Sequence, residues 1–386
     1  MITRILIPIL LAIVLTDAWF YWRYLRRWRW WWRVLWLLPS VALAIGAVMA
    51  AQEPDFIPVD STPIFWWLFC LVLIVVPKAI YALCSYSGRL WCRLTHKRRN
   101  YANIVGLVLV LVVWYILFYG TFVGSGKLNI KNVELSFSDL PPAFDGYRIV
   151  QFSDAHVGTL TGSRRHILER AVDTMLALKP DIIVFTGDLQ NTQPQELYQV
   201  RDLLASLKAR DGVYSVLGNH DYANYVSCPP STKIANCRET QSLERQMGWT
   251  LLMNEHRRIT RNGQSLVIAG MENDGEMPFL KLGDVKRTLA GTTKNDFVIM
   301  LEHDPTSWQR KILPQCRAQL TLSGHTHGGQ FRLFGWSPAA LRYLEWEGLY
   351  SRGDRRLYVT SGLGALIPFR FGVPGEIVVI TLKKAL

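Results

Sequence analysis

The sequence predicts an all-α membrane region with four helices, followed by an α/β domain. Half of the 386 residues are hydrophobic, and the excess lies before Lys127, in four apolar stretches that approach the ~20 residues needed to cross a bilayer. The chain after Lys127 has a globular composition, and its strand-like apolar runs end in polar turns. We therefore assign residues 1–126 to the transmembrane region and residues 127–386 to one α/β domain.

The four apolar stretches cover residues 5–21, 34–51, 64–85 and 102–123. The first is predicted to be an uncleaved span rather than a signal peptide, because no small-residue cleavage site follows it. Asp17 and Lys78 fall inside the first and third stretches. Ionisable groups at that depth either pair or extend separately towards the interface. We expect an Asp17–Lys78 pair, with separate extension as the alternative.

The distribution of charge predicts the orientation in the membrane. The net charge of +13 could indicate nucleic-acid binding, but arginines fill the first and third loops, while the second carries only acidic charges. Short basic loops stay in the cytoplasm. We therefore expect no nucleic-acid partner. The predicted location is a bacterial inner membrane, with the α/β domain facing the periplasm or the cell exterior.

Five polar motifs stand at or just after the ends of strand-like runs. They are Asp154-Ala155-His156, Gly187-Asp188, Gly218-Asn219-His220-Asp221, His303-Asp304 and Gly324-His325-Thr326-His327. Strand ends of this kind place distant side chains along one rim of a sheet. One Asp-x-His triplet is weak evidence, but five motifs in this order strongly indicate a shared metal site. Imidazole and carboxylate ligands suit Mn, Fe and Zn.

These motifs resemble those of the calcineurin-like metallophosphoesterase family, from about residue 133 to the C-terminus. Residues 324–330 read Gly-His-Thr-His-Gly-Gly-Gln, which is similar to a bacterial membrane-anchored branch of that family. The resemblance implies a four-layer α-β-β-α sandwich with two metals at one end. It also implies a first metal held by Asp154, His156 and His327, a second held by Asn219, His303 and His325, a bridging Asp188, and His220 beside the substrate.

The chemistry of phosphoester hydrolysis explains why such residues are needed. Two divalent ions ~3.5–4 Å apart acidify a shared water and clamp the phosphoryl group for in-line attack. A carboxylate such as Asp188 sets that spacing. We expect two divalent metals, Mn first, with Zn or Fe as alternatives. His220 is assigned as the general acid for the leaving oxygen, and Asp221 is expected to fix the tautomer of its ring.

The predicted function is that of a membrane-anchored, metal-dependent phosphoric ester hydrolase in which a metal-bridging hydroxide attacks the substrate. Its expected partners are the bilayer and a phosphorylated substrate, a lipid or another envelope molecule. Spacing does not choose among monoesters, diesters and pyrophosphates. The alternatives are a pyrophosphate hydrolase acting on a nucleotide-linked acyl sugar of the UDP-diacylglucosamine type, a transporter or sensor with a regulatory phosphoesterase domain, and an inactive binding module.

Three further segments carry expectations. Cys228 and Cys237 flank an irregular insertion, and an oxidising compartment would allow a disulfide between them. The aromatic-rich residues 331–350 form either core packing or an apolar wall beside the metals. Arg164 and Arg165 either meet a phosphate or are solvated residues at the start of a helix.

Overall fold

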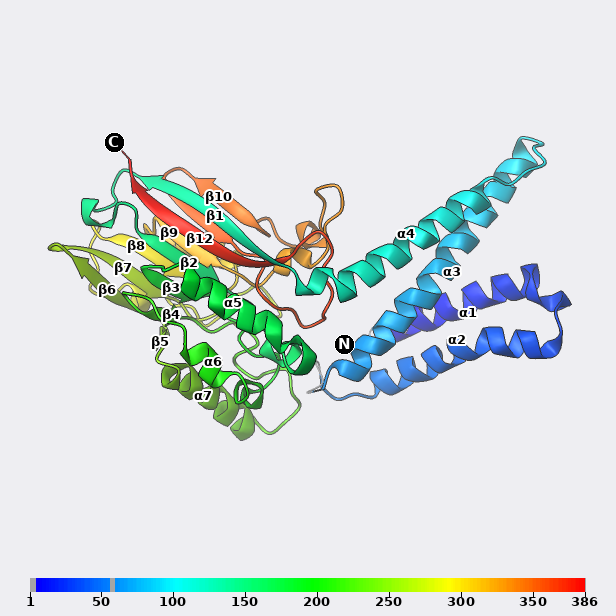
Figure 1. The fold of residues 1–386 in the computed structure, drawn as a ribbon, viewed down its shortest axis with the longest axis horizontal. Coiled ribbons are helices and arrows are strands. Elements are labelled where there is room, and N and C mark those ends of the chain that lie inside the picture. The colour runs from blue at the N-terminus through cyan, green and yellow to red at the C-terminus, as the bar shows by residue number, and fades with distance from the viewer. Residues whose placement is uncertain (1–4, 56–59, 386) are drawn as a thin grey trace. The chain divides into compact units, whose positions relative to one another are not determined.

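The computed structural model describes residues 5–55 and 60–385 (Figure 1). The chain divides into two compact units, Met1–Thr121 and Phe122–Leu386. Within the described residues, the first unit contains four helices that are long and apolar enough to span a membrane, as the sequence predicts. They are α1 (Leu6–Arg23), α2 (Trp30–Ala51), α3 (Thr62–Leu94) and α4 (Ala102–Phe122).

A buried ion pair joins the first three helices. Lys78 Nζ lies 2.7 Å from Asp17 Oδ1 and donates a second hydrogen bond of 2.9 Å to Ser40 Oγ. The same ammonium group lies 5.1 Å from the centroid of the Trp36 ring. A lone charge at this depth is costly, and a partner removes much of that cost. The predicted Asp17–Lys78 pair is therefore confirmed.

The described part of the second unit forms two six-stranded sheets. The strands of the first sheet are, in order, β1 (Leu128–Phe137), β12 (Gly375–Lys384), β2 (Arg148–Phe152), β3 (Ile182–Phe185), β4 (Val213–Ser215) and β5 (Thr250–Leu251). Those of the second are β10 (Gly348–Arg352), β11 (Arg355–Val359), β9 (Leu320–Ser323), β8 (Phe297–Leu301), β7 (Gln264–Gly270) and β6 (Glu255–Arg261).

Both sheets are mixed, and their central strands are parallel. In the first sheet β2, β3, β4 and β5 pair in parallel, while β12 runs antiparallel to β2 and parallel to β1. In the second sheet β7, β8, β9 and β11 are parallel, with β6 and β10 antiparallel at the edges. Parallel strands end at the same edge, so the loops after β2, β3 and β4 share one rim, as do those after β8 and β9.

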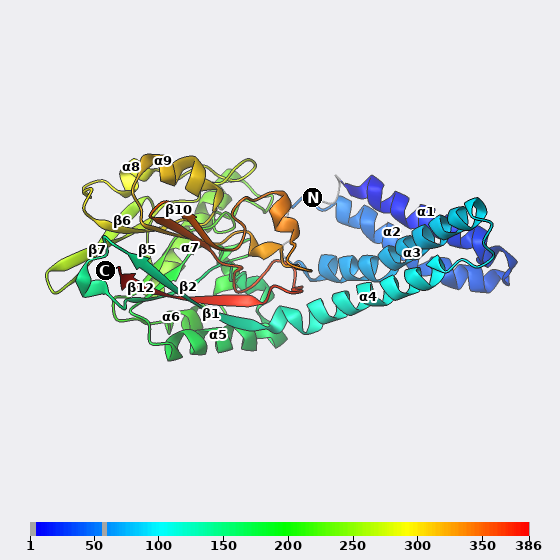
Figure 2. The ribbon, with the colours of Figure 1, turned by 90° about the horizontal axis from the view of Figure 1, so that it is seen from above.

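Helices cover the outer face of each sheet, giving four layers. The helices against the first sheet are α5 (Arg165–Ala177), α6 (Arg201–Ala205) and α7 (Pro230–Gln246). Those against the second are α8 (Val285–Thr288), the helical turn Trp308–Ile312 and α9 (Leu313–Gln315). Figure 2 shows α5 and α6 on one side of the sandwich and α8 and α9 on the other. The predicted α-β-β-α sandwich after four membrane helices is confirmed.

Apolar side chains alternate between the two faces of each strand. They form three apolar layers, one between the sheets and one between each sheet and its outer helices. In β2, Ile149 packs between the sheets, whereas its neighbour Val150 packs under the helices of the first sheet. In β8, Ile299 faces the inter-sheet core and Met300 faces the outer helices. Successive strand side chains point to opposite faces, so buried strands of this kind are apolar throughout.

The segment between Cys228 and Cys237 differs from the prediction. It is not irregular, because Pro230 begins helix α7, and proline suits a first helical position. Cys237 lies about two turns into that helix, whereas Cys228 precedes it. Both thiols are free within the described chain, so the structure does not contain the predicted disulfide.

The ion pair between α1 and α3 generates a stability prediction. Asp17→Asn should lower the free energy of unfolding by about 3 kcal/mol, because it leaves Lys78 charged and unpaired in an apolar environment. The double variant Asp17→Asn/Lys78→Met should recover most of the loss. The measurement is equilibrium unfolding of the full chain in detergent micelles, with the exposed loop substitution Glu53→Gln as control. Equal stability of Asp17→Asn and the unsubstituted protein would refute the role of the pair.

Candidate metal centre

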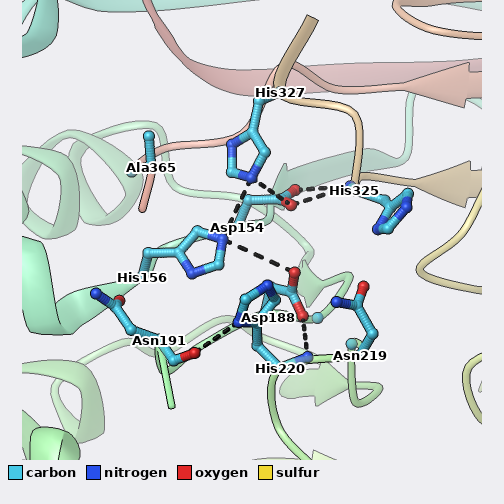
Figure 3. A network of polar contacts seen from close by, with 12 residues as sticks. Asp154, His156, Asp188, Asn191, Asn219, His220, His325, His327 and Ala365 are labelled. Carbon is cyan, nitrogen blue, oxygen red and sulfur yellow. Dashed lines mark hydrogen bonds and ion pairs between the residues drawn. The ribbon is translucent and has the colours of Figure 1, made fainter. Parts of the chain in front are cut away.

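Five loops bring the motif side chains to one end of the sandwich. Asp154 follows β2, Asp188 follows β3, and the Asn219–His220 loop follows β4; His303 and His325 follow β8 and β9 of the other sheet. Figure 3 shows side chains from both sheets pointing toward one another in a single cluster. The structure therefore gathers residues that lie up to about half the chain apart.

Asp154, His156 and His327 form a first group of metal-ligating atoms. Their candidate ligand atoms all lie within 4.8 Å of one another. His156 Nε2 is 3.2 Å from His327 Nε2, which in turn is 3.5 Å from Asp154 Oδ1. Two imidazole nitrogens and one carboxylate oxygen at this spacing fit the ligand preferences of a divalent transition metal.

Asp188, His303 and His325 form a second group. His303 Nε2 lies 3.1 Å from Asp188 Oδ2 and 3.2 Å from His325 Nδ1. The same Asp188 oxygen is 3.8 Å from His156 Nε2 of the first group. The Asp188 carboxylate therefore lies between the two groups, where one side chain can contact two cations.

Asn219 adds an oxygen to this site. Its amide nitrogen donates a 2.7 Å hydrogen bond to the Tyr225 hydroxyl, which fixes the orientation of the amide. Its Oδ1 atom is buried and has no hydrogen-bond partner among the residues that the structure describes. A buried acceptor without a partner is costly, and a cation would remove that cost. The donor set therefore fits a pair of divalent metals.

Hydrogen bonds to the outer side of the rings fix which imidazole nitrogen faces the centre. His303 Nδ1 lies 2.7 Å from the Thr186 carbonyl oxygen and His220 Nδ1 lies 2.6 Å from that of Asn191. A carbonyl only accepts, so each Nδ1 carries the proton and donates it. The Nε2 lone pair of His303 is therefore left for a metal, an arrangement common around metal-bound histidines. His325 faces the centre with Nδ1, and its Nε2 lies 3.1 Å from the Tyr343 hydroxyl.

The prediction that Asp221 fixes the tautomer of His220 is wrong. The carbonyl of Asn191 holds that ring instead. The Asp221 carboxylate accepts backbone N–H groups at 2.8–3.2 Å, from Gly218, Asp188, Leu189 and Gln190. It thereby joins the loop after β3 to the loop after β4. Sequence patterns could not identify Asn191, because it acts through a backbone carbonyl that every residue carries.

Confinement of so many charges away from water shifts their pKa values in opposite directions. Burial raises the pKa of Asp154 to about 6. Burial and the neighbouring His220 lower the pKa of His156 to about 3, which keeps its ring neutral and able to bind metal. Although burial opposes it, the charge of Asp188 raises the pKa of His303 to about 10. A divalent cation would replace the proton shared by this last pair.

The backbone at the candidate ligands is strained. Left-handed conformations occur at Asp154 (φ 50°), His156 (φ 44°), Asp188 (φ 61°), His325 (φ 74°) and His327 (φ 52°). For residues with a Cβ atom this conformation costs roughly 1–2 kcal/mol each. Such conformations cluster at functional sites, where the surrounding structure enforces them.

Two glycines allow the loops to approach. A Cβ atom on Gly187, whose φ is 95°, would lie 2.5 Å from the Gly218 nitrogen and 2.7 Å from His303 Nδ1. A Cβ atom on Gly324 would lie 2.1 Å from Ser153 Oγ. Side chains at these positions would force the loops apart, so glycine is required there.

The other sequence-based expectations have mixed outcomes. Arg164 is not available to a phosphate, because its guanidinium donates to the Ser125 side chain and carbonyl and to the Thr159 carbonyl. Arg165 begins α5 and pairs with Glu169. In the segment 331–350, Tyr343 contacts His325, whereas several apolar side chains are exposed rather than packed in the core.

Comparison with known proteins agrees with this geometry. Residues 147–329 match the family model of the calcineurin-like phosphoesterases, and residues 3–125 match that of a probable calcineurin-like phosphoesterase transmembrane domain. The chain is 30% identical to the "Transmembrane protein with metallophosphoesterase domain" of Danio rerio, over 92% of this chain and 81% of that protein.

Two bacterial relatives match about two thirds of this chain. Identity is 35% to "Uncharacterized metallophosphoesterase YkuE" of Bacillus subtilis, over 69% of this chain and 89% of that protein. Identity is 29% to "UDP-2,3-diacylglucosamine pyrophosphatase LpxG" of Chlamydia muridarum, over 67% and 92%. With its four membrane helices and its two-sheet α/β unit, the chain belongs to the calcineurin-like phosphoesterase family, in the group that carries a transmembrane domain.

Proposed function

We propose that this membrane protein hydrolyses a phosphate ester at a binuclear metal centre in residues 127–386. Asp154, His156 and His327 would hold one divalent ion. Asn219, His303 and His325 would hold the other. The observation that carries the proposal is the position of the Asp188 carboxylate, which lies within 4 Å of histidine nitrogens from both groups. When bound, two such ions supply an activated water and neutralise phosphoryl charge.

His220 would act on the leaving group. Its Nδ1 proton is donated to the Asn191 carbonyl, so Nε2 is the nitrogen that exchanges a proton with substrate. The ring centroid lies 4.8 Å from that of His156, which places His220 beside the first group. A protonated His220 would donate from Nε2 to the leaving oxygen. Asp221 would act as a positioning residue, because it holds the Asp188 and Asn219 loops through backbone N–H groups.

Manganese is our proposed metal. The ligands are imidazoles, carboxylates and one amide oxygen, and the metal-ligating groups found within residues 5–55 and 60–385 contain no cysteine. This set suits Mn, Fe and Zn, and availability decides among them.

The proposed substrate is a phosphorylated lipid on the outer side of a bacterial inner membrane. Four membrane helices keep the catalytic unit at a bilayer, and the basic first and third loops favour an outward-facing catalytic unit. A second candidate is hydrolysis of the pyrophosphate in a nucleotide-linked acyl sugar, supported by the 29% identity to LpxG of Chlamydia muridarum. That substrate also combines acyl chains with a phosphorylated group. Vesicle-bound phosphatidate and UDP-diacylglucosamine, offered to the same metal-loaded protein, separate the two.

The bridging role of Asp188 predicts linked losses of metal and activity. Asp188→Asn should lower kcat/KM for p-nitrophenyl phosphate esters by about 10³-fold, because a neutral amide cannot balance two cations. Its metal content, measured by mass spectrometry, should fall below that of the unsubstituted protein. Chelation should abolish activity and Mn should restore it. The matched control is Asp173→Asn, an exposed carboxylate of α5; equal loss in both variants, or full activity of Asp188→Asn, would contradict the proposal.

The general-acid role of His220 predicts a dependence on the leaving group. His220→Asn should lower kcat by about 10²–10⁴-fold for phenyl esters, whose leaving oxygen needs a proton. The loss should be much smaller for p-nitrophenyl esters, whose leaving group departs as an anion. Steady-state kinetics on both esters test this, with His166→Asn as a control outside the motifs. Equal losses on the two esters would exclude proton donation by His220.

A further inference from the structure

A strained turn carries a fully exposed aromatic side chain near the metal centre. The backbone N–H groups of Leu333 and Trp336 each donate a 3.0 Å hydrogen bond to the carbonyl of the other, which closes a two-residue hairpin loop over Phe334 and Gly335. Both loop residues have positive φ, 51° and 81°. Asn-Gly is the usual sequence for such a turn. Phe334 instead combines an unfavourable conformation with 99% exposure, so folding gives no reason for an aromatic there.

Further exposed apolar side chains follow in the same segment. Leu341 is 79% exposed and Leu344 is 80% exposed. We define the apolar rim by its large exposed members, which are Leu333, Phe334, Trp336, Leu341 and Leu344. Isolated exposed apolar residues are ordinary, but several large ones in one short segment mark an interaction surface.

The apolar rim is fastened to the metal-binding loop. The Tyr343 hydroxyl lies 3.1 Å from His325 Nε2. Ser337 Oγ donates a buried 2.7 Å hydrogen bond to the Gly328 carbonyl, and Thr326 Oγ1 donates a 2.6 Å bond to the Trp346 carbonyl. Whatever the apolar rim contacts is therefore held near the candidate ligands His325 and His327.

A short segment connects α4 to the first strand of the second unit. Only residues 123–127 separate the end of α4 from the start of β1. Arg164 binds Ser125, and Arg170 donates to the Gly126 carbonyl, so this connection is held against α5. A unit joined this closely to a membrane-spanning helix remains at the bilayer surface. Within the second unit, Gly335 and Trp346 line a cavity together with Asn129 and Lys131 at the start of β1, so the apolar rim lies beside the point where the chain arrives from α4. The bilayer is therefore the apolar phase within its reach.

We propose that the apolar rim inserts into the interfacial layer of the bilayer and presents the phosphate of a membrane lipid to the metal centre. Leucine and phenylalanine side chains gain from leaving water there, and tryptophan is favoured at headgroup depth. Arg342, exposed between Leu341 and Tyr343, donates hydrogen bonds to the Tyr343 hydroxyl and the Met277 carbonyl, which helps to hold this segment in place. The substrate part of this inference rests on the proposed phosphoesterase function, whereas insertion of the apolar rim does not.

Photo-crosslinking tests insertion without using activity. The full-length protein is reconstituted in phosphatidylethanolamine–phosphatidylglycerol vesicles, with p-benzoylphenylalanine in place of Phe334 or Leu344. Illumination should add the mass of a phospholipid to either protein. The same probe in place of Tyr198, which is 52% exposed outside the apolar rim, should give no lipid adduct. Absence of lipid adducts at both rim positions, or crosslinks to a second copy of the chain, would overturn the proposal.

Kinetics then test delivery of the substrate. The triple variant Phe334→Ser/Leu341→Ser/Leu344→Ser should hydrolyse soluble p-nitrophenyl esters within about twofold of the unsubstituted protein. Its rate on phosphatidate in vesicles should fall about tenfold or more, because apolar contact with the membrane is lost. Tyr198→Ser is the control and should retain both rates. Equal rates on vesicles would overturn lipid delivery; inactivity of the unsubstituted protein on every phosphoester would instead reject the proposed function and leave the crosslinking result valid.

Discussion

Confinement of opposite charges in a space without water is the constraint on which the second unit depends. Asp154, Asp188 and His303 are almost completely buried, and each would be strongly hydrated in an unfolded chain. Burying such groups is unfavourable unless each has a partner of opposite charge or a metal. In the described residues the partners are supplied by the other members of the cluster, so the pKa values of Asp154, His156 and His303 each depend on the charges of their neighbours.

The two sheets make that confinement structurally feasible. Neither sheet supplies the whole site: the first contributes Asp154 and Asp188, and the second contributes His303 and the loop after β9. The inter-sheet core, with residues such as Ile149 and Ile299, holds the two rims together. Asp221 performs the same task within the first sheet through four backbone hydrogen bonds. The site thus lies where loops of the two sheets meet, and its geometry depends on packing in the inter-sheet core.

Much of this arrangement could be predicted from the sequence, because strand ends and spans leave strong patterns. Alternating burial marks the strands, and a run of apolar residues marks each membrane helix. Contacts made by backbone atoms leave no such pattern. The sequence therefore points to Asp221 as the group that orients the His220 ring, whereas the structure shows that the Asn191 carbonyl does so. Two consecutive prolines, Pro229 and Pro230, favour a loop in a sequence-based prediction, although Pro230 occupies the first turn of α7, where its missing N–H costs nothing. The contact of Tyr343 with His325 depends on tertiary packing that spacing does not encode.

The left-handed backbone at Asp154, His156 and Asp188 has a consequence for how this chain would change under different selection. Glycine adopts that conformation without steric penalty, so glycine in place of His156, whose ring is neutral, would relieve strain without leaving a neighbouring charge unpaired. Glycine in place of Asp188 would instead leave His303 without its partner. A screen that rewards only thermal resistance would therefore select glycine at His156 and lose a candidate metal ligand with it. At a position of this kind, greater stability comes with loss of activity. Libraries designed to stabilise the protein should therefore leave it unchanged.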